Sequence, residues 1–171
     1  MNVIGLGQAG CNIADMFSQH PQYKIYKIDV DIKNDFDFAE QYGELEQTKK
    51  TYNIKQQKGP EEYEKNVPSM KTFFRGVKGE TLFVIGGSGS ISAMCLRIME
   101  QIKDKCEISV LYIRPDTSLL SKNKTLHEKA TYGILQEFAR SGLFKMLYLV
   151  SNIYLENILG EVPIIGYNNK V

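Results

Sequence analysis

One stretch decides the fold: Phe83-Val84-Ile85-Gly86-Gly87-Ser88-Gly89-Ser90-Ile91-Ser92, near the middle of the 171-residue chain. An apolar run, residues 81–85, predicts a buried strand before it, and apolar residues at spacings of three predict a helix after it. Such a glycine- and serine-rich joint leaves unpaired backbone N–H groups at the positive end of a helix dipole. Phosphate binds well there, because the backbone approaches the anion without side chains in the way. The alternative is a turn that only tightens the connection between strand and helix.

Composition limits the classes of protein that fit. The length suits one domain, which we expect to span residues 1–171, and the contents of 43% hydrophobic and 24% charged residues are ordinary for a globular protein. A net charge of +1 gives no indication of direct nucleic-acid binding. The longest apolar runs are too short for a membrane helix, and no signal peptide is visible. Three widely spaced cysteines, Cys11, Cys95 and Cys106, predict neither a disulfide framework nor a structural zinc site and suit the cytoplasm.

A second glycine motif stands at the start of the chain. Gly5-Leu6-Gly7-Gln8-Ala9-Gly10 has the G-x-G-x-x-G form at a predicted strand–helix junction, and Asp29-Val30-Asp31 follows the next strand about 20 residues later. In a dinucleotide-binding fold the glycines allow close approach of the pyrophosphate, and the acid binds a ribose hydroxyl. This motif by itself favours an NAD-type site.

Strands alternate with helices along the rest of the chain. Apolar runs predict strands at residues 2–7, 23–29, 81–85, 108–113 and 143–150, with a short edge strand near residues 49–54. Pro60 suits the first position of a helix, and a short helix is expected to carry Met70 and Phe73. A capping-box pattern predicts a helix starting at Thr125, whose apolar face is formed by residues at spacings of four, Leu126, Ala130, Ile134 and Phe138. The pattern predicts an α/β doubly wound domain with a mostly parallel sheet. Ligands in such sheets bind beyond the carboxyl ends of the strands, where both glycine stretches fall.

The combination of two glycine loops resembles the tubulin/FtsZ superfamily of polymerising GTPases. The segments that carry the resemblance are Gly5-Leu6-Gly7-Gln8-Ala9-Gly10-Cys11-Asn12, Gly59-Pro60-Glu61, Gly86-Gly87-Ser88-Gly89-Ser90, Leu149-Val150-Ser151-Asn152 and Gly166-Tyr167-Asn168-Asn169. They are similar, in that order, to the family's first phosphate loop, its loop near the γ-phosphate, its GGTGS signature, a guanine-binding strand end and the start of its central helix. A single short motif is weak, but agreement in order and spacing covers nearly the whole chain.

The resemblance implies that the chain binds GTP or GDP with Mg²⁺. Backbone N–H groups of the two glycine loops would hold the phosphates, and Asn152 with Asn169 or Asn168 would contact the guanine. The resulting candidate site residues are Gly7, Gln8, Ala9, Gly10, Cys11, Asn12, Asp31, Gly59, Gly86, Gly87, Ser88, Gly89, Ser90, Asp116, Asn152, Tyr167 and Asn169. The resemblance also implies head-to-tail self-association into a filament.

The chain departs from the family pattern in three places. Ile91 stands where the signature has another glycine and should narrow the phosphate pocket. The family's ribose-binding Glu has no clear match, and Asp116, Thr117 or Ser118 is expected to substitute. The family's catalytic acidic loop and second domain lie beyond residue 171, so we expect this chain to end at the start of the central helix. The similar motif at residues 35–40 lies in the wrong half and is interpreted as coincidence.

Three hypotheses therefore remain open. The first is a GTP-binding domain of a filament GTPase that hydrolyses poorly alone, because an adjacent subunit supplies the acidic loop. The second is an NAD(P)-binding Rossmann oxidoreductase domain. The third is a nucleotide-binding module that interacts with partners and is not an enzyme. Among single residues, Asn152 has an alternative role as a helix N-cap. His20 and His127 are isolated and have no expected metal-binding or catalytic role.

Overall fold

The computed structural model describes residues 1–30, 32 and 49–159, and within them six strands form one sheet. The strand order is β3-β2-β1-β4-β5-β6, and every neighbouring pair is parallel. The strands are β1 (Asn2–Leu6), β2 (Lys24–Asp29), β3 (Lys49–Asn53), β4 (Gly79–Gly86), β5 (Cys106–Arg114) and β6 (Met146–Ser151). This is the strand order of a Rossmann-type doubly wound sheet, so the predicted fold class is confirmed.

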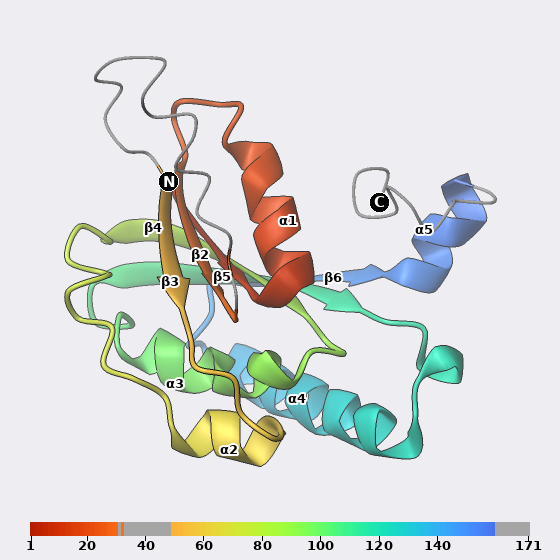
Figure 1. Cartoon of the computed structure of the whole chain (residues 1–171). Helices are drawn as coiled ribbons and strands as arrows, with labels where there is room; N and C mark the ends of the chain where they lie inside the picture. The colour runs from red at the N-terminus through yellow and green to blue at the C-terminus, as the bar shows by residue number, and fades with distance from the viewer. Residues whose placement is uncertain (31, 33–48, 160–171) are drawn as a thin grey trace.

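Helices cover both faces of the sheet. Figure 1 shows α1 on one face and α2, α3 and α4 on the other, with α5 beyond β6. The helical elements are α1 (Gly7–Phe17), α2 (Pro60–Lys65), the 3₁₀ turn η2 (Ser90–Met94), α3 (Cys95–Glu100), the 3₁₀ turn η3 (Thr117–Leu119), α4 (Lys122–Arg140) and α5 (Asn152–Leu159). None of the helices in the described part of the chain is long and apolar enough to span a bilayer.

Alternation along β1 and β4 produces the two layers of the core. Val3 and Val84 point to the α1 face and pack with Ala14, whereas Ile4 and Phe83 point to the opposite face. Successive strand residues face opposite sides, so one strand supplies both layers. All of these side chains are fully buried, which fixes the register of the central strands. The carboxyl ends of β1 and β4 consequently lie side by side, since Leu6 pairs with Ile85.

Helix α4 begins earlier than predicted. Ser121 is its N-cap and accepts a hydrogen bond from the Lys124 N–H at 3.4 Å, so the predicted start at Thr125 is wrong. Its buried residues are Glu128, Thr131 and Leu135. The apolar residues Leu126 and Ile134 lie on the exposed side instead, because the helix turns a mixed polar face toward the sheet.

The segment after α2 is also less helical than predicted. Residues 71–76 form turns, not the expected short helix. Side chains between α3 and β5 hold this segment: Gln101 contacts the Met70 N–H and the Pro68 carbonyl, and Lys105 donates to the Phe74 carbonyl. These bonds satisfy backbone groups of the turns and fix the segment to the rest of the domain.

Candidate functional site

The first glycine loop joins β1 directly to α1. Gly7 has a φ of 73°, a left-handed conformation that favours glycine. Gly10 lies so close to β4 that a Cβ there would be 2.3 Å from the Val84 carbonyl oxygen. A Cβ on Gly5 would similarly be 2.4 Å from the Gly10 carbonyl oxygen. The glycines therefore allow α1 to start against the sheet, with its first turn at the carboxyl edge.

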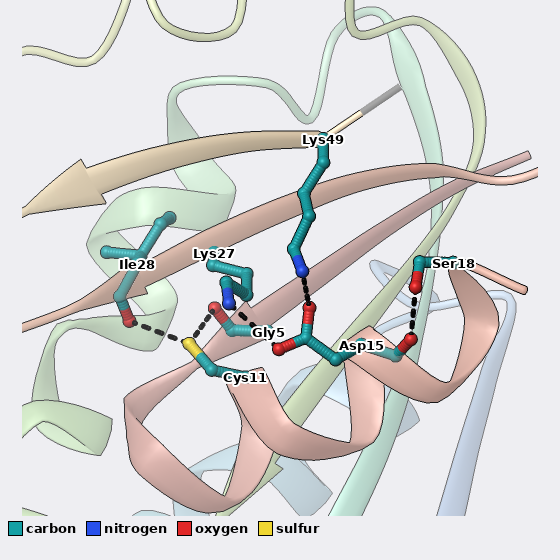
Figure 2. Close-up of polar contacts among 7 residues, drawn as sticks. All are labelled: Gly5, Cys11, Asp15, Ser18, Lys27, Ile28 and Lys49. Carbon is teal, nitrogen blue, oxygen red and sulfur yellow. Dashed lines mark hydrogen bonds and ion pairs between the residues drawn. The ribbon is translucent and has the colours of Figure 1, made fainter. Parts of the chain in front are cut away.

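Polar contacts fix α1 to the strands against which it packs (Figure 2). The Cys11 thiol donates to the carbonyls of Gly5 and Ile28, at 3.5 and 3.7 Å. Asp15 forms ion pairs with Lys27 of β2 at 2.8 Å and with Lys49 of β3 at 2.6 Å. Burial, followed by the charge of Asp29, raises the pKa of Cys11 to about 12. Cys11 is therefore a neutral packing residue at neutral pH rather than a reactive thiolate.

The second glycine loop joins β4 to the 3₁₀ turn η2. The Gly87 N–H donates to the Ile113 carbonyl at 2.9 Å, which fastens the loop to the end of β5. The Ser92 hydroxyl donates to the Gly86 carbonyl and closes the loop from within. A Cβ on Gly87 would be 2.3 Å from the Tyr112 hydroxyl, so only glycine fits at this position without displacement of its neighbours.

The two loops touch each other at two points. A Cβ on Gly7 would be 2.8 Å from Cγ2 of Ile91, and a Cβ on Gly86 would be 3.2 Å from that of Ala9. Between the loops lies a cavity of about 310 Å³. Seven predicted site residues line it: Gly7, Gln8, Ala9, Gly86, Ser88, Gly89 and Ser90. Ile91 lines the same cavity and is 6% exposed, so a bulky side chain does occupy this wall.

The cavity offers backbone donors rather than side-chain cations. None of its lining residues within the described chain is Lys or Arg. Neither α1 nor η2 has a side chain capping its N-terminus, so the N–H groups of their first turns have no side-chain acceptor. Asp29 is the acid at the cavity, and its Oδ1 accepts a hydrogen bond from the Val30 N–H at 2.7 Å. An anion held by main-chain donors, and not by a lysine, is the ligand chemistry that fits.

Other predicted residues lie around this cavity without lining it. Gly10 and Cys11 pack inside the first turns of α1, Asn12 follows them, and Gly87 faces β5. Gly59 is the N-cap residue of α2, whose Tyr63 does line the cavity. The remaining predicted residues, Asp31, Tyr167 and Asn169, lie outside the described residues, as do residues 35–40.

Asp116 and Asn152 occupy the neighbouring strand ends. Arg114 pairs with Ser151 in the sheet, so the loop carrying Asp116 and the start of α5 leave it at the same level. The Asp116 carboxylate caps η3 by accepting from the Ser118 N–H, and hydrogen bonds from the Ser118 side chain and then from its backbone lower the pKa of Asp116. Asn152 Oδ1 is buried and has no hydrogen-bond partner among the described residues, which leaves it available to a ligand and argues against the N-cap role. β6 is two strand spacings, about 10 Å, from β4.

The described residues fit a Mg²⁺ ion that is bound mainly through a ligand's phosphates and only by one protein carboxylate. They contain no group of three His, Cys, Asp or Glu side chains that could hold a metal ion. Mg²⁺ in nucleotide sites is bound mainly by phosphate oxygens and water, with one or two protein carboxylates. Asp29 is the residue at the cavity that would hold it in this way, and the ion would neutralise phosphate charge.

Sequence reasoning assigned no role in the site to four lining residues, Leu6, Val30, Tyr63 and Ser92. Tyr63 follows Pro60 by three residues, a helical spacing that could have placed it on the same side as the start of α2. Ser92 was within the quoted stretch, but nothing in the sequence showed that its hydroxyl would turn back to Gly86.

The fold and cavity together define a doubly wound domain with an anion-suited site at the carboxyl edge of its sheet. No family model and no curated protein sequence matches the chain. Among solved structures, it is similar to the GTPγS-form protofilament of TubZ from Bacillus thuringiensis serovar israelensis, with a TM-score of 0.60 and 14% identity. The GDP-form protofilaments of the same protein match with a TM-score of 0.59 and 13% identity.

These matches cover 92% of this chain but only 47% and 46% of the TubZ chains, so the chain spans about half their length. A short-chain dehydrogenase/reductase from Burkholderia vietnamiensis also matches, with a TM-score of 0.52 and 12% identity over 88% of this chain and 82% of that one. At such identities the similarity shows a shared fold: Rossmann-like and tubulin-like.

Proposed function

We propose that residues 1–171 are the guanine-nucleotide-binding domain of a tubulin/FtsZ-like filament GTPase. The observation that carries the proposal is the contact between two glycine loops around one cavity, because a dinucleotide fold requires only the first loop. The likeness to TubZ protofilaments in GTPγS and GDP forms supports the choice of guanine nucleotide.

In this proposal the phosphates lie at the two uncapped helix starts. The N–H groups from Gln8 to Gly10 and from Ser88 to Ser90 bind them, and the hydroxyls of Ser88 and Ser90 add hydrogen bonds; the Gly87 N–H is already bonded to the Ile113 carbonyl. Asp29 lies at the phosphate end with Mg²⁺, and Asn152 contacts the base at the other end of the site. The orphaned Oδ1 of Asn152 supports this, since an amide oxygen accepts from a base N–H.

A competition assay tests the nucleotide. GTP and GDP labelled with a fluorophore should bind the purified chain in the presence of Mg²⁺, and unlabelled GTP should displace them better than ATP or NAD. Asn152→Leu removes the accepting Oδ1 at a similar side-chain volume and should weaken GTP binding by about tenfold, the loss expected for a buried hydrogen bond to a base. Binding that does not distinguish GTP from ATP would contradict the guanine assignment.

An NAD(P)-binding domain is the second candidate. It is favoured by the G-x-G-x-x-G loop, by Asp29 at the end of β2, where the ribose-binding acid is expected, and by the dehydrogenase match. Tight NAD or NADP binding without GTP binding would establish it in place of the first.

Hydrolysis and assembly form a further part of the proposal. The chain alone should bind GTP and hydrolyse it slowly, because the acidic loop is expected from an adjacent subunit. Phosphate release measured at low and high protein concentration separates these cases. Rapid turnover at low concentration would overturn the need for a neighbour, and binding without turnover at any concentration would favour a non-enzymatic module.

A further inference from the structure

Helix α4 packs near the second glycine loop, although it begins more than 30 residues after that loop in sequence. Two consecutive residues of this helix have no role in the function proposed above: His127, which interacts with Gly89, and Glu128, which interacts with Tyr112 beside the loop. Their chemistry is unusual for the interior, because both carry buried polar atoms that lack a partner within the described chain.

Glu128 is fully buried on α4. Its Oε1 accepts from the Arg114 Nε at 3.2 Å, whereas Oε2 has no hydrogen-bond partner among the described residues. Arg114 in turn lies over the Tyr132 ring, with 4.8 Å from its guanidinium carbon to the ring centroid. Burying a carboxylate costs desolvation free energy unless ion pairs and hydrogen bonds of good geometry offset it, so we expect this cluster to be rigid.

Tyr112 connects this cluster to the loop. Its ring stacks on Tyr132 at 5.7 Å between centroids, and its hydroxyl lies beside the Glu128 carboxylate. Burial and then the charge of Glu128 raise the pKa of the Tyr112 hydroxyl, which keeps it protonated. The same hydroxyl is the atom that a Cβ on Gly87 would approach to 2.3 Å, so the loop rests directly on it.

His127 reaches the other end of the loop. Its imidazole interacts with the backbone of Gly89, and its Nε2 is buried without a partner among the described residues. Burial lowers the pKa of His127, so the ring is neutral at neutral pH and adds no charge near the anion site. Tyr112 thus lies against Gly87, and His127 interacts with the backbone of Gly89, although neither side chain belongs to the loop.

We propose that Glu128 and Tyr112 are positioning residues that set the shape of the second glycine loop: Tyr112 lies against Gly87, and the cluster of Glu128, Arg114 and Tyr132 holds Tyr112 in place. Neither residue is expected to touch the ligand. The inference rests on the proposed function only in its consequence for nucleotide binding, because the loop geometry is present without a ligand.

The test compares Glu128→Gln and Tyr112→Phe with Tyr26→Phe as a matched control. Tyr26 is also a buried tyrosine of the same sheet, but it contacts the aromatic rings of Phe73 and Phe74 away from the loop. Amide NMR signals and hydrogen exchange of residues 86–90 report loop shape in the ligand-free chain. Nucleotide affinity and dissociation rate report its consequence.

Both variants should shift these amides, speed their exchange and weaken nucleotide binding by about fivefold, mainly through faster dissociation. The control should change thermal stability without moving the loop signals. Loop signals like the wild type in both Glu128→Gln and Tyr112→Phe would overturn the inference, and Tyr112→Phe decides alone where Glu128→Gln fails to fold. If the wild type binds no nucleotide while the loop signals still shift, the proposed function fails and the positioning role stands.

Discussion

Each of the two glycine loops joins a strand to a helical element, but different contacts hold their backbones in place. In the first, the glycines determine the backbone conformation: Gly7 takes a left-handed conformation, and Gly10 lets α1 lie against the Val84 carbonyl. In the second, side chains hold the backbone: Tyr112 of β5 lies against Gly87, and Ser92 of η2 donates to the Gly86 carbonyl. The first loop is thus shaped by its own glycines where they pack against β4, whereas the second also depends on side chains from β5 and α4.

This difference separates stability from ligand binding. A change in the first loop should disturb the packing of α1 on the sheet and therefore the whole fold. A change beneath the second loop should alter the shape of the anion site at a smaller cost in stability. Four substitutions or conditions test the contrast, in decreasing order of expected effect.

Gly10→Ala should have the largest effect. Its Cβ would meet the Val84 carbonyl oxygen at 2.3 Å, and neither backbone can move without separating α1 from β4. Such overpacking against backbone should lower the free energy of unfolding by about 3 kcal/mol or more, measured by urea denaturation.

Gly133→Ala is the matched control for this substitution. Gly133 lies inside α4, and a Cβ there would meet nothing within 4 Å. Alanine should raise the free energy of unfolding by up to about 1 kcal/mol, because it favours the helix. Equal destabilisation by both substitutions would contradict the packing role of Gly10.

Gly87→Ala should act on the second loop. The added methyl group would meet the Tyr112 hydroxyl at 2.3 Å and Cζ at 2.8 Å, so the loop must lift away from β5. Nucleotide binding should weaken by about tenfold, while unfolding changes by about 1–2 kcal/mol. Adding Tyr112→Phe to this variant removes the nearest atom and should restore part of the affinity, whereas simple additivity of the two changes would sink the steric explanation.

The same contrast explains what the sequence could predict. Apolar runs placed the strands, and the fingerprint Gly5-Leu6-Gly7-Gln8-Ala9-Gly10 could be recognised locally, since strand, turn and helix are adjacent. The doubly wound parallel sheet and the carboxyl-edge position of both loops were predicted from the alternation of strands and helices and are confirmed.

Tertiary contacts decided the features that sequence reasoning missed. The apolar spacing of Leu126 and Ile134 indicated the inward side of α4, yet the helix buries Glu128 instead, because Arg114 and Tyr112 surround that carboxylate. Similarly, His127 had no expected role because its partner, Gly89, is distant in sequence. Local periodicity contains no information about such partners.

Ser92→Ala should have a smaller effect. It removes the hydroxyl that donates to the Gly86 carbonyl in a nearly fully buried position, which should cost about 1 kcal/mol in the free energy of unfolding. Ser141→Ala removes a similar bond, from the Ser141 hydroxyl to the Phe138 carbonyl at 2.8 Å, on the exposed end of α4. Water replaces that bond, so the control should lower the free energy of unfolding by less than about 0.5 kcal/mol. A similar loss in both variants would contradict a stabilising role for the buried Ser92 hydrogen bond.

Acidification should have the smallest effect, and it isolates His127. Burial lowers the pKa of this side chain below its ordinary value of 6.5, so between these two values the unfolded chain binds more protons than the folded one. The free energy of unfolding should therefore fall as the pH drops through about 6.5, by less than about 1 kcal/mol for this half-exposed ring. Other groups titrate too, so the measurement is the difference between wild type and His127→Asn in urea denaturation from pH 8 to pH 5. The two curves of unfolding free energy against pH should converge as the pH falls if neutral His127 stabilises the backbone at Gly89. Parallel curves would show that His127 does not stabilise the second loop.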